Sequence, residues 1–488
     1  MTMRIPTRLL LATLPAVLLG CGGGGGGSVG GADGGGGNDA GGPGGGIDRG
    51  GVTISQGPIN GFGSVIVNGV RYSTTGATIT IDDRPGTESE LRAGQVVRVE
   101  GTVDATGTAG TARSISFNDD VEGPVQSIDP AAAQLVVLGQ TVQVGRATSF
   151  DDSISPRSLE GLAVGDRIEV SGLVNADGLI AATRIERKPP SATFEVKGPA
   201  SAVDSNARRL SINLLMVDYS TAQLSNFGGG TPANGDLVEA HGSLNAAGVL
   251  IATRLERRSA SLEGTTDDSA DLDGLVTRYV SSVDFDVAGQ RVTTTATTVY
   301  EGGNAANLVL GANVEVEGGF AANASLVAGR IEFRRESDVE LAALVDSVNV
   351  AAGSLVVLGV TVRTNALTRF EDQSDADLPR FSLSDLRAGD YVELSAYDDG
   401  GGLVASLLER DDPDDRIEVE GPASAVAAPE FTIAGIRITT DDQTEFRNND
   451  GGSISAATFF AAAAGREVKV RGALVGNTVL AEQAELED

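Results

Sequence analysis

The sequence is poor in the side chains that build metal centres and nucleophilic active sites. Its 488 residues include one cysteine, Cys21, and one histidine, His241. A single cysteine excludes an intrachain disulfide, and one residue of each type excludes zinc clusters built from several Cys and His ligands. A histidine-dependent catalytic triad would have only His241 available.

Positive charge is also scarce. Lys and Arg total 36 against 67 Asp and Glu, which gives a formal net charge of −31. Such an acidic chain repels nucleic-acid phosphates and anionic lipid head groups. We therefore expect no nucleic-acid partner, whereas the charge tolerates cationic partners and divalent cations. Solubility is the simplest role for the charge.

Aromatic residues make up 4% of the chain and Trp is absent, whereas glycine is abundant, with 66 residues. Glycine and short polar residues favour turns, so the composition predicts many short strands rather than long helices. The length predicts several domains rather than one core.

The first 21 residues have the parts of an export signal. Arg4 and Arg8 make a positive front, and an apolar run that is too short to span a bilayer follows. The run ends in "LLGC", which resembles a bacterial lipoprotein signal with cleavage after Gly20 and lipidation of Cys21. The resemblance implies a lipid-anchored protein of the bacterial cell envelope, and Gly22 in place of Asp implies the outer membrane, on its periplasmic side or at the cell surface. An ordinary secretory signal with an unmodified cysteine is the alternative.

One phrase recurs through the rest of the chain: "LAVGDRIEVSG" ends at Gly172, and close variants end at Gly101 and Gly318. Apolar and polar residues alternate between its two glycines, which predicts a strand with one buried and one solvated face. The leading glycine predicts a turn, and the closing glycine predicts a bulge that helps a small barrel to close. The leading glycines are Gly94, Gly165, Gly235, Gly311, Gly389 and Gly465, and the fifth copy closes with Ala396 instead of glycine.

Other short sequence motifs recur in a fixed order around this repeated segment. A first strand such as "VEGPVQSI" precedes a hairpin such as "LVVLGQTVQV", a variable connector, the repeated phrase and a last strand such as "GLIAATRIER". Five strands with a helical connector between the third and the fourth are the order of an OB-like barrel. These motifs resemble the bacterial lipoprotein module of domain-of-unknown-function family 5666. The resemblance implies this fold and an exported protein, but it implies no particular chemical activity.

We therefore predict an all-β chain, a tandem array of six small OB-like five-stranded β-barrels, each with its own core and a short helical connector. A signal peptide and a disordered Gly-rich tether precede the array. The expected segments are the signal at 1–20, the tether at 21–51, and repeats at 52–119, 120–189, 192–258, 271–335, 338–411 and 416–488.

An aromatic residue ends the third strand in four copies, as Phe150, Tyr300, Phe370 and Phe446, and the first copy has Ile81 there. OB-like barrels use exposed aromatic rings to stack bases or sugars, which makes these four residues candidates for ligand binding. Their recurrence, and the aliphatic Ile81, favour a packing role in which the ring closes the end of the barrel.

Acidic residues offer candidate ligands for a cation. Asp267, Asp271 and Asp273 cluster before a glycine and are candidates for weak divalent binding, although their spacing fits no EF-hand. Solvated linker charge is the simpler interpretation, and we expect no cofactor. His241 takes a polar position of the repeated phrase that other copies fill with Glu, Ser or Arg, so we expect it to face solvent.

The repeats favour structure over catalysis. Catalysis needs one preorganised constellation, whereas the six copies are degenerate and contain neither a G-x-S-x-G nor a P-loop motif. We expect a non-enzymatic scaffold or adhesive protein that binds glycan or protein, a monomer that touches the membrane only through its N-terminal lipid. The alternative is a polysaccharide-acting envelope enzyme that uses paired carboxylates in one repeat. Analogy with OB folds alone suggests a nucleic-acid binder, which the charge and the export signal oppose.

Overall fold

A computed structural model describes residues 52–62, 64–378, 380–412, 416–449 and 451–487. The predicted signal, with Gly20 and Cys21, and the Gly-rich tether lie outside the described residues. Within the described ranges, no helix is long and apolar enough to cross a membrane.

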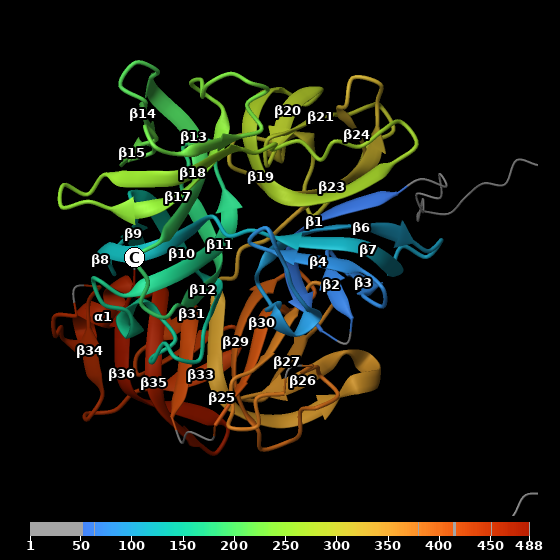
Figure 1. Cartoon of the computed structure of the whole chain (residues 1–488). Coiled ribbons are helices and arrows are strands. Elements are labelled where there is room, and N and C mark those ends of the chain that lie inside the picture. Colours follow the sequence, from blue (N-terminus) through green and yellow to red (C-terminus); the bar gives the residue numbers. More distant parts are fainter. Residues whose placement is uncertain (1–51, 63, 379, 413–415, 450, 488) are drawn as a thin grey trace, which may run out of the picture. The chain divides into compact units, whose positions relative to one another are not determined.

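The described chain folds into six β-barrels that follow one another in sequence (Figure 1). The first barrel consists of β1 (Thr53–Gly61), β2 (Val65–Val67), β3 (Val70–Ser73), β4 (Thr78–Ile81), β5 (Arg84–Pro85), η1 (Glu88–Glu90), β6 (Val96–Val103) and β7 (Ala109–Phe117). The second consists of β8 (Val121–Asp129), β9 (Gln134–Val137), β10 (Gln140–Phe150), η2 (Leu159–Gly161), β11 (Arg167–Val174) and β12 (Ile180–Arg187). The third consists of β13 (Phe194–Asp204), β14 (Arg209–Ile212), β15 (Leu215–Asp218), β16 (Gln223–Ser225), β17 (Leu237–Leu244) and β18 (Leu250–Arg257).

The second half of the chain repeats this order. The fourth barrel consists of β19 (Ser269–Ser281), β20 (Asp284–Val287), β21 (Gln290–Thr293), β22 (Val299–Glu301), η3 (Ala305–Asn307), β23 (Asn313–Phe320) and β24 (Leu326–Phe333). The fifth consists of β25 (Val339–Asn349), η4 (Val350–Ala352), β26 (Ser354–Val357), β27 (Val360–Arg363), β28 (Arg369–Asp372), β29 (Tyr391–Asp398) and β30 (Leu403–Asp411). The sixth consists of β31 (Ile417–Ala427), β32 (Glu430–Ile433), β33 (Ile436–Thr439), β34 (Glu445–Arg447), α1 (Ala456–Ala462), β35 (Glu467–Val475) and β36 (Thr478–Leu486).

Each barrel closes as the predicted five-stranded OB-like fold. In the first barrel, β1 pairs antiparallel with both β2 and β6, and β6 pairs antiparallel with β7. The last strand, β7, then runs parallel to β3 and β4, which closes the barrel through its third strand. The third strand is split into two segments in five barrels and is continuous in β10, where the register shifts between Val144 and Ser149.

The two glycines of the repeated phrase act as predicted. All six leading glycines adopt φ values between +74° and +97°, a conformation that L residues avoid, just before the fourth strand. At the closing position the pairing of the fourth and fifth strands shifts in every copy, as between Ser171 and Gly172. A Cβ on Gly172 would lie 2.4 Å from the carbonyl oxygen of Ala181, so the bulge brings two backbones together.

The connector is helical in four barrels, through η1, η2, η3 and α1. In the third and fifth barrels, the described connector residues contain no helix, so the predicted helical turn is wrong for these two copies. The connector of the sixth barrel carries the longest helix because Ala456–Ala462 is rich in alanine and Ser455 caps its first turn. Its Phe459 is fully buried and packs on Phe431 and Phe446 at ring-centroid distances of 5.6 and 5.0 Å.

The barrels join in pairs, which the sequence did not predict. Strand β8 pairs with β13, and β25 pairs with β31, so the second and third barrels share one sheet, and so do the fifth and sixth. Strand β1 runs parallel to β19, which joins the first barrel to the fourth across two intervening barrels (Figure 1). In each pair the contact is made by the two first strands.

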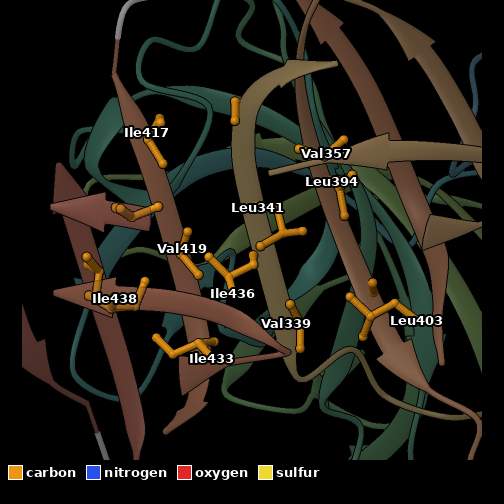
Figure 2. Packing of buried hydrophobic residues seen from close by; sticks show 14 of the residues in the cluster. Val339, Leu341, Val357, Leu394, Leu403, Ile417, Val419, Ile433, Ile436 and Ile438 are labelled. Atoms are coloured by element: carbon orange, nitrogen blue, oxygen red, sulfur yellow. The ribbon is translucent and has the colours of Figure 1, made fainter. Parts of the chain in front are cut away.

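Pairing merges hydrophobic cores that we expected to be separate. One buried cluster runs through the fifth and sixth barrels, where Leu341 of β25 and Val419 of β31 lie on neighbouring strands (Figure 2). A second cluster spans the second and third barrels. In the remaining pair, Ile54 of the first barrel is buried in the core of the fourth. The physical reason is that a first strand with an unpaired edge gains backbone hydrogen bonds and apolar burial by adding a neighbour.

Candidate functional site

The polar face of the fourth strand is buried in the second, third and fourth barrels, which corrects the prediction of a solvated face for these copies. Its inward residues form the cores as expected, but Glu169, Glu239 and Glu315 on the other face are 4%, 0% and 2% exposed. Neighbouring strands and barrels cover this face, and buried carboxylates need cationic partners there. The partners are Lys188 for Glu169 at 2.7 Å, Arg258 for Glu239 at 2.8 Å, and Arg330 for Glu315 at 3.0 Å.

Last strands contribute a second row of charges to the same face. An Arg and a Glu two residues apart pair along the strand in three barrels, as Arg184 with Glu186 at 2.6 Å. The equivalent pairs are Arg254 with Glu256 and Arg330 with Glu332. In the fifth barrel Leu407 replaces the arginine, and Glu409 therefore lacks this neighbour.

Arg146 of the second barrel reaches the junction between the fifth and sixth barrels. Its guanidinium lies 2.6 Å from Glu420, 2.8 Å from Glu467 and 3.6 Å from Glu340. Glu340 and Glu420 are direct neighbours on β25 and β31. Like charges at such positions repel, so Arg146 stabilises both the junction and the contact with the second barrel.

A second contact joins the second barrel to the fifth. Arg184, which is 5% exposed, lies 3.1 Å from Glu371. In return, Arg369 of the fifth barrel donates a 2.7 Å hydrogen bond to the carbonyl oxygen of Thr183. Both guanidinium groups are buried and hydrogen-bonded, which fixes the two barrels against each other.

A hollow of about 2100 Å³ lies beside these contacts, between the barrels of the described chain. Its wall comes from β10 and the connector of the second barrel, from β29 and β30 of the fifth, from β31 and β35 of the sixth, and from the end of the fourth barrel. This volume exceeds the roughly 300–1,000 Å³ of a typical small-molecule pocket. The hollow is therefore large enough for an oligomeric ligand.

The wall of the hollow carries many charges of both signs. Eight Arg or Lys and twelve Asp or Glu residues line it, including Arg146, Arg157, Lys469, Glu393, Glu409 and Asp411. Many of these groups pair with one another across barrels, as Arg157 pairs with Asp411. Serine, threonine, asparagine and tyrosine residues fill the spaces between them. The wall thus presents many hydrogen-bond donors and acceptors, with acids in moderate excess over bases.

Glu409 is the unusual carboxyl of the hollow. It is 9% exposed and is a direct neighbour of Glu393 on β29 and of Glu371 on β28. Burial raises the pKa of Glu409 to about 8, and the charge of Glu371 adds to the rise. Burial also raises the pKa of Glu393. Titratable groups perturbed in this way within a hollow indicate a functional site.

Replacing Glu409 by Gln should remove a pH-dependent loss of stability. Because the folded-state pKa of Glu409 lies above its unfolded value, the folded protein holds an extra proton between about pH 4.5 and 8, and stability falls as pH rises through this window. Each pKa unit corresponds to about 1.4 kcal/mol. Thermal unfolding midpoints of E409Q and the unaltered chain should agree near pH 5 and diverge at pH 8.5, with E409Q higher. Parallel pH curves for the two proteins would contradict this assignment.

We predicted that His241 faces solvent, but most of its side chain is buried. Its ring lies 3.1 Å from Glu195 and 2.7 Å from Glu239, and its side chain is 18% exposed. Burial lowers the pKa of His241, but the hydrogen bonds to the two carboxylates raise it more strongly, to about 9. The prediction is wrong because the polar slot of the third barrel meets other charged strands rather than water.

The four candidate aromatic residues pack against the barrel cores. Phe150 and Phe446 are buried, whereas Tyr300 and Phe370 are half-buried on the core surface. Phe150 also lines the hollow. The counterpart in the first barrel is Ile79 rather than the predicted Ile81, because Ile79 pairs with Ile115 as Phe150 pairs with Ile185.

The three candidate cation ligands are not gathered in one place. Asp267 is exposed in a turn, whereas Asp271 and Asp273 lie on β19 and are 5% and 8% exposed. Asp271 accepts a 2.9 Å hydrogen bond from Asn68, and Asp273 pairs with Arg334 at 3.0 Å. The interpretation as solvated linker charge is therefore wrong for Asp271 and Asp273.

Sequence reasoning missed Arg146 and Glu409. Arg146 follows a glycine in an irregular part of the third strand, where no repeat pattern marks it. Glu409 did carry a signal, because Leu407 breaks the Arg-x-Glu pattern of the last strand in the second, third and fourth copies. Comparing the copies position by position would have singled out this acid.

Comparison with known protein families shows that the chain matches one family model. A family model described as a domain of unknown function, DUF5666, matches residues 53–116, 122–186, 197–256, 273–332, 343–409 and 420–485. None of the curated proteins matches the chain. The solved structure "drosophila Unr CSD456" is similar at 16% identity, covering 36% of this chain and 84% of its own, with a TM-score of 0.12.

Proposed function

Because the chain belongs to the DUF5666 family and carries six of its domains, we propose that it is a non-enzymatic binding protein of the bacterial cell envelope, with the hollow as its site for an uncharged, hydroxyl-rich glycan. The observation that supports this proposal is the wall of the hollow, where several Arg and Lys residues pair with acids and side-chain hydroxyl and amide groups lie between these pairs.

Paired charges suit hydroxyl groups. A sugar hydroxyl both donates and accepts hydrogen bonds, and a wall of guanidinium, carboxylate, amide and hydroxyl groups offers both functions. Such pairs neutralise each other and do not select an ion. The volume of about 2100 Å³ accommodates several sugar units rather than one.

Two aromatic rings of the wall give the hollow surfaces for stacking. Tyr397 of β29 and Phe333 of β24 line the hollow and are half-buried, so part of each ring is accessible. OB-like folds bind oligosaccharides as well as oligonucleotides, and stacking on aromatic rings tolerates different ligands. The acidic chain favours a neutral glycan over a phosphate polymer.

The envelope location is part of the proposal and depends on the sequence of the first 21 residues. Lipidation of Cys21 would hold a monomer at the outer membrane through its N-terminal lipid alone, with residues 22–51 as spacer. Metabolic labelling with palmitate tests this: the chain should carry label in the membrane fraction, and C21S should carry none. Equal labelling of C21S would refute the anchor.

Binding is tested by titrating neutral hexose oligomers and neutral N-acetylhexosamine oligomers into the full chain in a calorimeter. We expect Y397A to weaken binding by about tenfold or more, because a stacked ring contributes about 1–3 kcal/mol. Y279A is the matched control, since Tyr279 is 38% exposed and lies away from the lining of the hollow. If neither class of glycan binds, or if both variants weaken it equally, the hollow is not the glycan site.

A polysaccharide-acting enzyme is the second candidate, and Glu409 is the observation that favours it. Glu393 and Glu409 are neighbouring carboxyls in one barrel of six, and the pKa of Glu409 is raised to about 8 by burial. Such a carboxyl is protonated at neutral pH, as a general acid must be. The same glycans should then be shortened by the unaltered chain and left intact by E409Q. Binding without any shortening supports the first candidate.

A further inference from the structure

The junction between the second and third barrels places carboxylates opposite one another. Glu122 of β8 and Glu195 of β13 are direct partners in the antiparallel pairing. The junction between the fifth and sixth barrels has the same design, with Glu340 opposite Glu420. Like charges directly opposite on paired strands destabilise a sheet unless a cation lies between them.

The two junctions differ in the charged groups that surround the facing carboxylates. At the fifth and sixth barrels, Arg146 and Lys469 approach Glu420 at 2.6 and 3.1 Å. At the second and third barrels, Arg167 lies 2.5 Å from Glu122 and the ring of His241 lies 3.1 Å from Glu195, but a third acid, Asp119, is also present. Asp119 lies in the link between β7 and β8 and is 1% exposed. Neither of its carboxylate oxygens has a hydrogen-bond partner among the residues that the structure describes.

The cations near Asp119 already pair with other acids. Lys188 lies 2.7 Å from Glu169, Arg167 lies 2.5 Å from Glu122, and Lys197 lies 2.9 Å from Asp120. Burial has the larger effect in raising the pKa of Asp119, and Asp82 adds another negative charge that contributes to this rise. A buried carboxylate without a partner is costly, so the cluster is short of positive charge.

The geometry of the cluster fits a divalent cation. One carboxylate oxygen each of Asp119, Glu122 and Glu169 can be chosen so that all three lie within 4.8 Å of one another. Calcium binds oxygen ligands at about 2.3–2.6 Å, so ligands on opposite sides of the ion lie up to about 5 Å apart. Magnesium binds at about 2.0–2.1 Å and requires a tighter octahedron.

We propose that Asp119, Glu122 and Glu169 bind a calcium ion at the junction of the second and third barrels. The ion supplies the positive charge that Asp119 lacks among the residues that the structure describes. Asp119 belongs to the link that follows the first barrel, and Glu122 faces Glu195 of the third. Calcium would therefore hold the link that follows the first barrel against the second barrel, beside its junction with the third, independently of any ligand in the hollow.

Calorimetric titration of Ca²⁺ into the EDTA-treated full chain tests the proposal. We expect one site in the unaltered chain, a rise of the thermal unfolding midpoint on adding Ca²⁺, and a loss of affinity of at least about tenfold in D119N. D267N is the control, because Asp267 is an exposed acid outside the cluster, and it should bind Ca²⁺ as the unaltered chain does. If D119N fails to fold, E122Q is measured in its place.

Two results would overturn the calcium site. The first is an unaltered chain that takes up no Ca²⁺ at millimolar concentration and keeps the same unfolding midpoint, which would mean that Asp119 is held protonated. The second is equal Ca²⁺ affinity in D119N, or in E122Q, and in the unaltered chain, which would place the ion elsewhere. Loss of glycan binding affects neither result.

Discussion

Replacing Arg146 by Met should lower the free energy of unfolding by about 3 kcal/mol, since removing one partner of a buried ion pair costs about 3–5 kcal/mol and this group is partly accessible. Arg146 contacts Glu340, Glu420 and Glu467, which come from two barrels other than its own. Without the guanidinium, the carboxylates of Glu340 and Glu420 face each other across β25 and β31 with less compensation. Chemical denaturation of R146M measures the loss.

The control for this variant is R437M. Arg437 pairs with Glu430 at 2.6 Å, but both side chains are largely exposed, and such surface pairs contribute about 0–1 kcal/mol. A second check is rescue: adding E420Q to R146M should recover part of the loss, because the amide removes one of the facing charges. If R146M is no less stable than R437M, the contact between the second barrel and the fifth and sixth barrels does not stabilise the fold.

The structure of a single barrel could be predicted from the sequence because its signals are local. Residues alternating between core and surface, such as Ile168, Glu169 and Val170, define the fourth strand, and their inward members are buried as expected. Gly165 and Gly172 mark its turn and its bulge. Each of these features depends on backbone conformation or burial within one copy, so one copy's residues suffice to specify it.

The environment of the polar face could not be predicted in the same way. Alternation shows which residues leave the core, but a polar residue opposite a charged neighbour and a polar residue in water give the same pattern. Glu239 and Glu315 thus look like solvated glutamates in the sequence although they are buried against arginines. His241 was misplaced for the same reason.

The choice of pairing partner left only one trace in the sequence. At one position of the first strand, the second to sixth copies have an acid, such as Asp271 or Glu340, whereas the first copy has Ile54. Ile54 is 4% exposed and packs in the core of the fourth barrel. An apolar residue at a position that is otherwise acidic marks a protein contact, but it does not reveal which barrel provides it.

The hollow was also out of reach of sequence reasoning, because its wall combines residues from distant copies. Arg146 and Lys469 are separated by more than half of the chain, yet both line it. The candidate aromatic residues are predictable within each barrel, and only Phe150 among the four reaches the hollow. Tyr397 directly follows the closing position of the fifth copy. No other copy has an aromatic residue at this position, although Phe320 lies one position further along in the fourth copy.

A disulfide between residues 53 and 269 should form almost completely when both are cysteine. Thr53 and Ser269 are neighbours on the parallel strands β1 and β19, and their side-chain oxygens lie 3.1 Å apart. This separation allows a disulfide with little movement of the backbone. Barrels strung along the chain without mutual contacts would keep these residues apart, because two barrels intervene between them.

The direct test of paired barrels is therefore the oxidation of a chain that carries T53C, S269C and C21S, followed by non-reducing electrophoresis and mass spectrometry of the linked peptides. Paired first strands predict an intramolecular link between 53 and 269 in nearly all molecules, and no link in the control with T53C, S424C and C21S, since β1 does not pair with β31 in the described sheets. Free thiols in the first protein, or links only between separate molecules, would contradict the pairing on which the buried charges and the hollow depend.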